Sequence, residues 1–280
     1  MPCVQLTALE DHQALDNLQG VNSALVTGAA SGLGREIALD LARRGWRLVL
    51  PVRTATRAHD VVAAVRTMGA PAPLVVECDL SDHVAVRRMC RTVAGEGRLD
   101  LVVNNAAVGG GADPALRETN AAGVELRMAV NAITPHLIAR ELSGALTSAG
   151  RIVQVGSMGQ LPLDLDDLNH ERDYAGIRAY CRSKVALVMS AIELARDGVP
   201  VNVVHPAREM PTPMVIEGGF PIASTLDDGT LAVLRVALDS ELADVRGAYF
   251  HRFERAQPHE QALDAHARGR VVAWIEDRVA

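Results

Sequence analysis

Tyr180 and Lys184 stand four residues apart near the start of a helical pattern that runs to about Arg196. Lys184 is the only lysine in the chain, and the other 27 basic residues are arginine. Residues four apart lie on one face of a helix, so the phenol and the ammonium are expected to be neighbours. A phenol has an ordinary pKa of about 10, and a nearby positive charge lowers that pKa toward the range useful for proton transfer. The spacing indicates an acid–base pair; the alternative is a surface lysine beside a half-buried tyrosine.

Alternating strand and helix patterns must hold this pair in place. Short apolar runs predict strands at residues 23–27, 46–52, 74–77, 99–104, 151–155, 199–205 and 247–250. Helical patterns lie at residues 35–44, 56–68, 82–94, 122–146, 180–196, 229–238 and 261–278. Nearly continuous apolar strands separated by helices are typical of a parallel sheet covered on both faces. We predict one doubly wound α/β domain over residues 1–280, with an N-terminal extension over residues 1–20.

A glycine-rich loop joins the first predicted strand to the first predicted helix. Its glycines are Gly28, Gly32 and Gly34. Glycines let the backbone approach a pyrophosphate, and the N-terminus of a helix attracts its negative charge. A glycine triplet alone can be a simple tight turn, but between a strand and a helix it predicts a nucleotide site.

The end of the second predicted strand discriminates between the two nicotinamide cofactors. An acidic residue there binds the ribose 2′-hydroxyl of NAD(H), whereas a basic residue suits the 2′-phosphate of NADP(H). Here Val52 is followed by Arg53, then by Arg57, with no acid between them. This favours NADP(H); the alternative is that Arg53 is an ordinary solvated arginine. Asp79, after the third strand, is placed to receive the adenine amino group.

Composition and charge restrict the class of protein. The net charge is −6 and the arginines are scattered, which argues against a nucleic-acid or anionic-membrane partner. The four cysteines form no C-x-x-C pair and the histidines no H-E-x-x-H motif, so we expect free thiols and no metal. The start of the chain lacks a signal-peptide pattern and no apolar run reaches eighteen residues. We therefore expect a soluble, cytoplasmic protein.

Taken together and in order, the motifs of the chain resemble the short-chain dehydrogenase/reductase family. They are Thr27-Gly28-x-x-x-Gly32-x-Gly34, Asp79-Leu80, Asn104-Asn105-Ala106, Asn131, Ser157 and Tyr180-x-x-x-Lys184. Residues 167–174 and 247–250 resemble the retinol-dehydrogenase-like branch of that family. The resemblance covers nearly the whole chain and implies a Rossmann-type fold.

The resemblance also implies a catalytic tetrad and a set of cofactor contacts. Tyr180 is implied as the general acid that protonates a carbonyl oxygen, and Lys184 as the group that lowers its pKa and holds the nicotinamide ribose. Ser157 is implied to bind the substrate oxygen, and Asn131 to support a water that connects Lys184 to solvent. The implied cofactor contacts are Thr27, Gly28, Ser31, Gly32, Leu33, Gly34, Arg53, Asp79, Leu80, Asn105, Ala106, Tyr180, Lys184, Pro206 and Thr212.

Pro135 lies four residues after Asn131 within one helical pattern. Because proline has no N–H, the Asn131 carbonyl would lack its usual helical donor and be free to bind a water. The alternative is a helix that only kinks or begins later.

The chain departs from the family pattern at three places near the cofactor. Ala107 and Ala207 stand where the family has glycine, and Thr212 comes one place later than the usual threonine. Ser157 and Tyr180 are also further apart than is common, which implies a longer loop beside the substrate.

These observations predict an NADP(H)-dependent oxidoreductase that interconverts a carbonyl and an alcohol on a lipophilic small molecule. The alternatives are an enzyme of the same fold that reduces C=C bonds or catalyses another redox step on a natural product, and a non-catalytic NADP(H)-binding sensor. Residues 206–228, rich in proline and glycine, are predicted to form a mobile loop over much of the substrate pocket. Association into a homo-oligomer stays open.

Overall fold

The computed structural model describes residues 20–279 of the chain. The predicted extension over residues 1–20 lies, apart from Gly20, outside the described residues, as does Cys3. Within the described residues, no helix combines the length and the apolar character that crossing a membrane requires.

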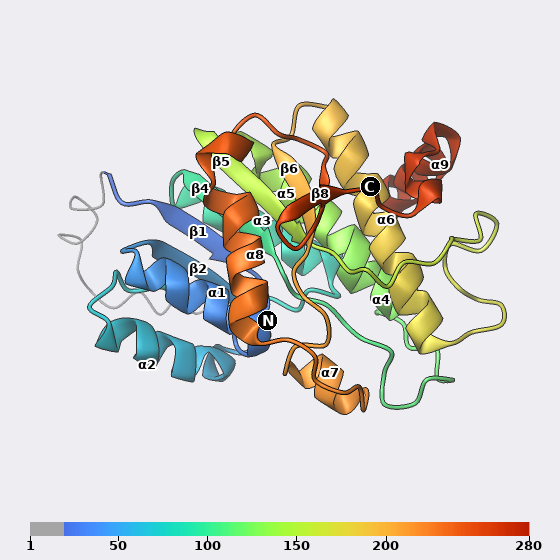
Figure 1. Cartoon of the computed structure of the whole chain (residues 1–280), viewed down its shortest axis with the longest axis horizontal. Coiled ribbons are helices and arrows are strands. Elements are labelled where there is room, and N and C mark those ends of the chain that lie inside the picture. The colour runs from blue at the N-terminus through green and yellow to red at the C-terminus, as the bar shows by residue number, and fades with distance from the viewer. Residues whose placement is uncertain (1–19, 280) are drawn as a thin grey trace.

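Within residues 20–279 the strands form one eight-stranded sheet (Figure 1). Along the sheet they follow the order β3-β2-β1-β4-β5-β6-β7-β8, and every neighbouring pair is parallel except β7 and β8. Their bounds are β1 (Ser23–Val26), β2 (Arg47–Val52), β3 (Leu74–Glu77), β4 (Leu99–Asn104), β5 (Leu146–Val155), β6 (Val201–His205), β7 (Tyr249–His251) and β8 (Glu254–Ala256). The strand order reverses between β1 and β4, and a ligand crevice is expected outside the carboxyl ends of these strands.

Helices cover both faces of the sheet and give it two apolar cores. One core joins the sheet to α1 (Gly32–Arg43), α2 (His59–Thr67) and α8 (Leu226–Leu238), and Figure 1 shows this layer in front. The other joins it to α3 (His83–Gly95), α5 (Thr134–Leu142), α6 (Gly176–Arg196) and α9 (Ala265–Val279). Along β1 the side chains alternate between the cores, because successive residues of a strand point to opposite faces. The predicted doubly wound Rossmann-type fold is therefore confirmed.

The single helix predicted over residues 122–146 is wrong. The structure has a short helix α4 (Leu126–Met128), a π-helical turn (Ala129–Ile133) and then α5, whose second residue is Pro135. Proline cannot donate to the preceding turn, which accounts for the interruption. A 3-10 turn (Ser143–Ala145) follows α5, and Leu146 already pairs with Leu99 of β4.

The predicted irregular segment over residues 206–228 contains regular structure. It includes the helix α7 (Pro213–Glu217), and α8 begins at Leu226, three residues earlier than the pattern predicted, where Thr225 caps it through a capping box with Asp228. The antiparallel strand β8 was not predicted; it folds back on β7 through a tight turn at Arg252. Further 3-10 turns lie at Ala55–Ala58, Ser240–Leu242 and Glu260–Leu263.

Candidate active site

Tyr180 and Lys184 lie one turn apart on α6, as their spacing predicts. The Lys184 Nζ lies 5.7 Å from the centroid of the Tyr180 ring. Lys184 is 2% exposed and donates a hydrogen bond of 2.9 Å to the carbonyl of Val155, the last residue of β5. The pair therefore sits at the carboxyl edge of the sheet, where the switch point predicts a ligand.

The pKa of Tyr180 differs from the sequence-based prediction. Proximity to an ammonium predicts a lowered pKa, whereas burial raises the pKa of Tyr180, and its contact with Ser157 opposes this rise only in part. Burial also lowers the pKa of Lys184 to about 8. Removal from water disfavours the charged form of both groups, and it is the largest cause of both shifts.

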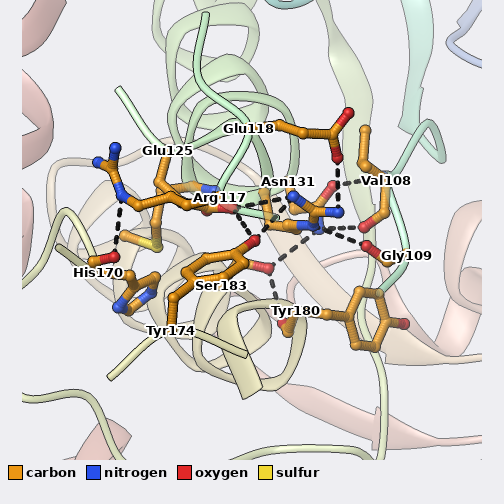
Figure 2. Close-up of polar contacts among 12 residues, drawn as sticks. Val108, Gly109, Arg117, Glu118, Glu125, Asn131, His170, Tyr174, Tyr180 and Ser183 are labelled. Atoms are coloured by element: carbon orange, nitrogen blue, oxygen red, sulfur yellow. Dashed lines mark hydrogen bonds and ion pairs between the residues drawn. The ribbon is translucent and has the colours of Figure 1, made fainter. Parts of the chain in front are cut away.

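The side chain of Asn131 forms hydrogen bonds with the loop after β4 and with α6 (Figure 2). Its Oδ1 accepts a hydrogen bond of 2.8 Å from the Val108 N–H, and its Nδ2 donates to the Val108 carbonyl at 2.9 Å. The same Nδ2 donates to Ser183 Oγ at 3.0 Å, and Ser183 donates in turn to the Tyr180 carbonyl at 2.7 Å. Asn131 also lies in the π-helical turn. The water-binding role of its carbonyl stays a prediction.

Ser157 follows β5 by two residues and is half-buried. Its Oγ accepts a hydrogen bond of 3.0 Å from the Gly159 N–H, which leaves the proton of the hydroxyl free to be donated. Its contact with Tyr180 brings the two hydroxyl-bearing side chains together.

The glycine loop is held against the end of β4. Thr27 Oγ1 accepts hydrogen bonds from the N–H groups of Asn105 at 2.9 Å and of Ala106 at 3.0 Å. Asn105 Nδ2 donates to the Thr27 carbonyl at 3.0 Å. A Cβ atom at Gly28 would lie 2.8 Å from Asn105 Nδ2, and one at Gly34 would overlap the same atom. Side chains at these positions would therefore push the glycine loop and the start of α1 away from the residues that follow β4.

The remaining predicted cofactor residues lie around this loop or on adjacent strand ends. Ser31 is the N-cap residue of α1, yet its side chain does not cap the helix, and Leu33 is buried in the first turn. The side chain of Thr212 packs against Gly32, and Thr212 is the N-cap residue of α7. Pro206 is buried at the end of β6.

Arg53 and Asp79 follow β2 and β3, the two outer strands on this side of the sheet. Arg53 is exposed after β2, and within residues 20–279 neither it nor Arg57 forms an ion pair. Asp79 is exposed and accepts hydrogen bonds from the N–H and hydroxyl of Ser81, both at 2.9 Å. The carbonyl of Leu80 accepts a hydrogen bond from Thr134 at 2.6 Å, which ties this strand end to α5.

A buried polar cluster beside Asn131 was missed by the sequence analysis (Figure 2). Arg127 is fully buried and donates to the Gly109 carbonyl at 2.8 Å, to the Tyr174 hydroxyl at 2.8 Å and to Glu118 at 2.9 Å. Tyr174 donates to the buried Glu125 at 2.9 Å. No motif in the sequence singles out Arg127 or Glu125, and Tyr174 was included only in the resemblance at residues 167–174.

The segment between Ser157 and α6 is fastened to this cluster. Asn169 Oδ1 accepts a hydrogen bond of 2.9 Å from the Glu125 N–H. Arg117 donates to the carbonyls of Asn169 at 2.8 Å and of His170 at 2.9 Å. The long loop implied by the spacing of the motifs is therefore ordered by polar contacts. Within the described residues, no three His, Cys, Asp or Glu side chains converge as a metal site would need.

Comparisons with known proteins agree with the fold. Residues 22–218 match the family model described as short chain dehydrogenase. Human retinol dehydrogenase 14 is 30% identical over 86% of this chain and 81% of its own length. Mouse polyprenol dehydrogenase is 29% identical over 90% of this chain and 82% of its own length. A crystal structure of a short chain dehydrogenase from Burkholderia cenocepacia in complex with NADP has a TM-score of 0.65 and 28% identity, covering 82% of this chain and 95% of that one.

The fold and the matched residues define an oxidoreductase with a dinucleotide-binding sheet. The chain belongs to the short-chain dehydrogenase family, in its retinol-dehydrogenase-like branch.

Proposed function

We propose that this oxidoreductase uses NADP(H) to interconvert a ketone or aldehyde and an alcohol on a lipophilic small molecule. The observation that carries the proposal is that Tyr180 and Lys184, in the first half of α6, lie together with Ser157, just after the carboxyl end of β5. Asn131 is connected to the same helix by its hydrogen bond to Ser183.

The residues around the first glycine loop fit a dinucleotide. Gly28 and Gly32 have positive φ values of 70° and 55°, and Gly34 packs directly on Asn105, so the backbone is bare where a diphosphate would approach. Ser31 leaves the first N–H groups of α1 to another acceptor, and the N-terminus of a helix suits a phosphate. Thr212, above Gly32, would close this loop from the other side.

The 2′-phosphate preference is supported by the exposed basic residues after β2. Arg53 and Arg57 are both exposed and are not engaged by a carboxylate of the described residues. The carboxylate at the end of β3, Glu77, accepts a hydrogen bond of 2.6 Å from the Ala55 N–H. The Burkholderia relative is a complex with NADP, which points the same way.

In the proposed reaction the nicotinamide supplies or accepts the hydride when bound. In the reducing direction the Tyr180 hydroxyl gives its proton to the substrate oxygen, while the Ser157 hydroxyl donates a hydrogen bond to that oxygen. The Gly159 N–H orients Ser157 for this donation. Lys184, whose pKa is about 8, is largely charged at neutral pH and stabilises the phenolate that remains.

A lipophilic substrate is supported by the apolar surface beside the site. Met214 of α7 and Ile177 of α6 lie against Gly109 and Gly110, in the loop that follows β4. Ile177 is 46% exposed, and Ile216 in α7 and Phe220 shortly after α7 are 63% and 47% exposed. The names of the relatives include retinol and polyprenol, both apolar alcohols. We propose that residues 206–228, which carry α7, border the substrate.

The test is carbonyl-dependent oxidation of NADPH, screened over apolar ketones and aldehydes, by the wild type and Tyr180→Phe. We expect the wild type to turn over and the variant to lose activity by several orders of magnitude while still binding NADPH. Equal turnover by both proteins would remove the assigned general acid. NADPH binding without turnover of any carbonyl would favour the sensor, and reduction of enones at C=C alone would favour the natural-product redox alternative.

A further inference from the structure

A tyrosine of the C-terminal hairpin contacts Ser157. Tyr249 opens β7, is 6% exposed, and donates a hydrogen bond of 3.0 Å to the Ser157 carbonyl, 92 positions away. Its ring packs on Gly156, where an added Cβ would lie 3.7 Å from the ring. Gln160 Nε2 donates to the same carbonyl at 2.8 Å. The carbonyl oxygen of Ser157 therefore accepts two hydrogen bonds, one for each of its lone pairs.

Side-chain amides tie the segment after Ser157 to the C-terminal segment. Gln160 Oε1 accepts a hydrogen bond of 2.7 Å from the His259 N–H. Gln261 pairs with both backbone groups of Leu163, accepting at 2.7 Å and donating at 2.9 Å. A hollow of about 330 Å³ lies between these segments, lined by Met158, Gln160, Tyr249, His251, Pro258 and His259. Of the contacts made by Tyr249, Gln160 and Gln261, those of Tyr249 and Gln160 reach Ser157 itself.

We propose that Tyr249 is a positioning residue for Ser157, an inference that rests on the proposed function. Ser157 is held at two points: its Oγ accepts from the Gly159 N–H, and its carbonyl accepts from Tyr249 and Gln160. Together these contacts hold the peptide group after Ser157 and the Ser157 Oγ in place, so the hydroxyl donates in directions away from the Gly159 N–H. The C-terminal hairpin thereby sets the angle at which Ser157 meets the substrate oxygen. A catalytic hydrogen bond depends strongly on that angle.

The competing explanation is that Tyr249 is a core residue whose hydroxyl is merely satisfied. Tyr249→Phe removes one oxygen and keeps the ring, so the variant is expected to fold. If Tyr249 positions Ser157, kcat falls about tenfold, the order of one hydrogen bond, while the affinity for NADPH stays near the wild-type value. A core role alone would leave kcat unchanged, and in both cases loss of the buried hydrogen bond lowers the melting temperature slightly.

A double-mutant cycle tests whether the effect passes through Ser157. In the Ser157→Ala background, Tyr249→Phe should have no further effect on kcat, because there is no hydroxyl left to orient. Equal fold losses in both backgrounds would overturn the proposal. Gln160→Leu removes the second donor and should lower kcat in the same Ser157-dependent manner.

The matched control is Gln261→Leu, which breaks the amide pairing with Leu163 and touches no atom of Ser157. We expect kcat within twofold of the wild type. A loss as large as that of Tyr249→Phe would assign the effect to the loop and contradict the proposal. If Ser157→Ala keeps the full kcat, the proposed function of Ser157 fails. If Ser157→Ala loses activity but Tyr249→Phe keeps the full kcat, only the positioning role of Tyr249 fails.

Discussion

Arg127 and Glu125 form an ion pair of 3.3 Å in which both side chains are fully buried. The same guanidinium holds the Gly109 carbonyl, while Asn131 holds Val108 on both of its backbone groups. Two side chains from one irregular helix thus fix the loop that follows β4. This loop contacts α6 at Ile177 and α7 at Met214, so the buried pair supports the border of the proposed active site.

Replacing Arg127 by methionine should strongly destabilise the protein. The change leaves Glu125 charged and buried without a cationic partner, which costs about 3–5 kcal/mol of unfolding free energy. Urea unfolding followed by circular dichroism measures this loss. The double variant Arg127→Met/Glu125→Gln should recover part of it, because the carboxylate left without Arg127 is then Glu118, whose side chain is 42% exposed.

A surface ion pair provides the control for this measurement. Arg140 and Glu276 form an ion pair with side chains that are 57% and 47% exposed. Arg140→Met should cost less than about 1 kcal/mol, since exposed pairs contribute little. Similar losses at Arg127 and Arg140 would contradict the importance given to burial.

The cofactor preference should depend on Arg53. Arg53→Ala should raise the dissociation constant of NADPH by about ten- to a hundredfold, the range of a charge-assisted hydrogen bond, and leave that of NADH nearly unchanged. Fluorescence titration with both nucleotides measures the two constants. Arg66→Ala, an exposed arginine near the end of α2, should change neither. Tighter binding of NADH than of NADPH by the wild type would overturn the preference itself.

Acid should destabilise the protein through two buried histidines. Burial lowers the pKa of His136 and that of His205 to about 4, from an ordinary value of 6.5. Between these values the unfolded chain binds protons that the folded chain does not, so stability is lost as pH falls from about 6.5 to 4. Each histidine should contribute about 3 kcal/mol to this loss.

The variant His136→Leu isolates one of these contributions. Urea unfolding between pH 4 and pH 8 should show a shallower loss of stability in the variant than in the wild type. Above pH 7.5 the difference between the two proteins should become independent of pH, because the histidine is neutral in both states. Parallel curves down to pH 4 would show that His136 does not titrate as described.

The local signals that were predicted correctly share one physical basis. β1, β2 and β4 carry their apolar character in a few adjacent residues, and the Tyr180–Lys184 spacing equals one helical turn. Gly28 and Gly34 indicate a place where backbone segments approach each other closely. Each of these properties belongs to a short stretch of chain, so the stretch alone is sufficient to predict it.

The remaining features depended on contacts between segments far apart in the chain. Pro135 hinted at an interrupted helix, but pairing of Leu146 with Leu99 decided where β5 begins. Tyr249 reaches Ser157 only because β7 joins the sheet beside β6. The pKa of Tyr180 is raised, rather than lowered, because the folded chain withdraws the phenol from water. The sequence by itself determined the fold class, the glycine loop and the Tyr180–Lys184 pair, since these depend on the spacing of residues within short stretches of chain. Burial of Arg127 and Glu125, and the second set of contacts on Ser157, were decided by tertiary structure alone, because solvent exclusion arises only when distant segments pack together.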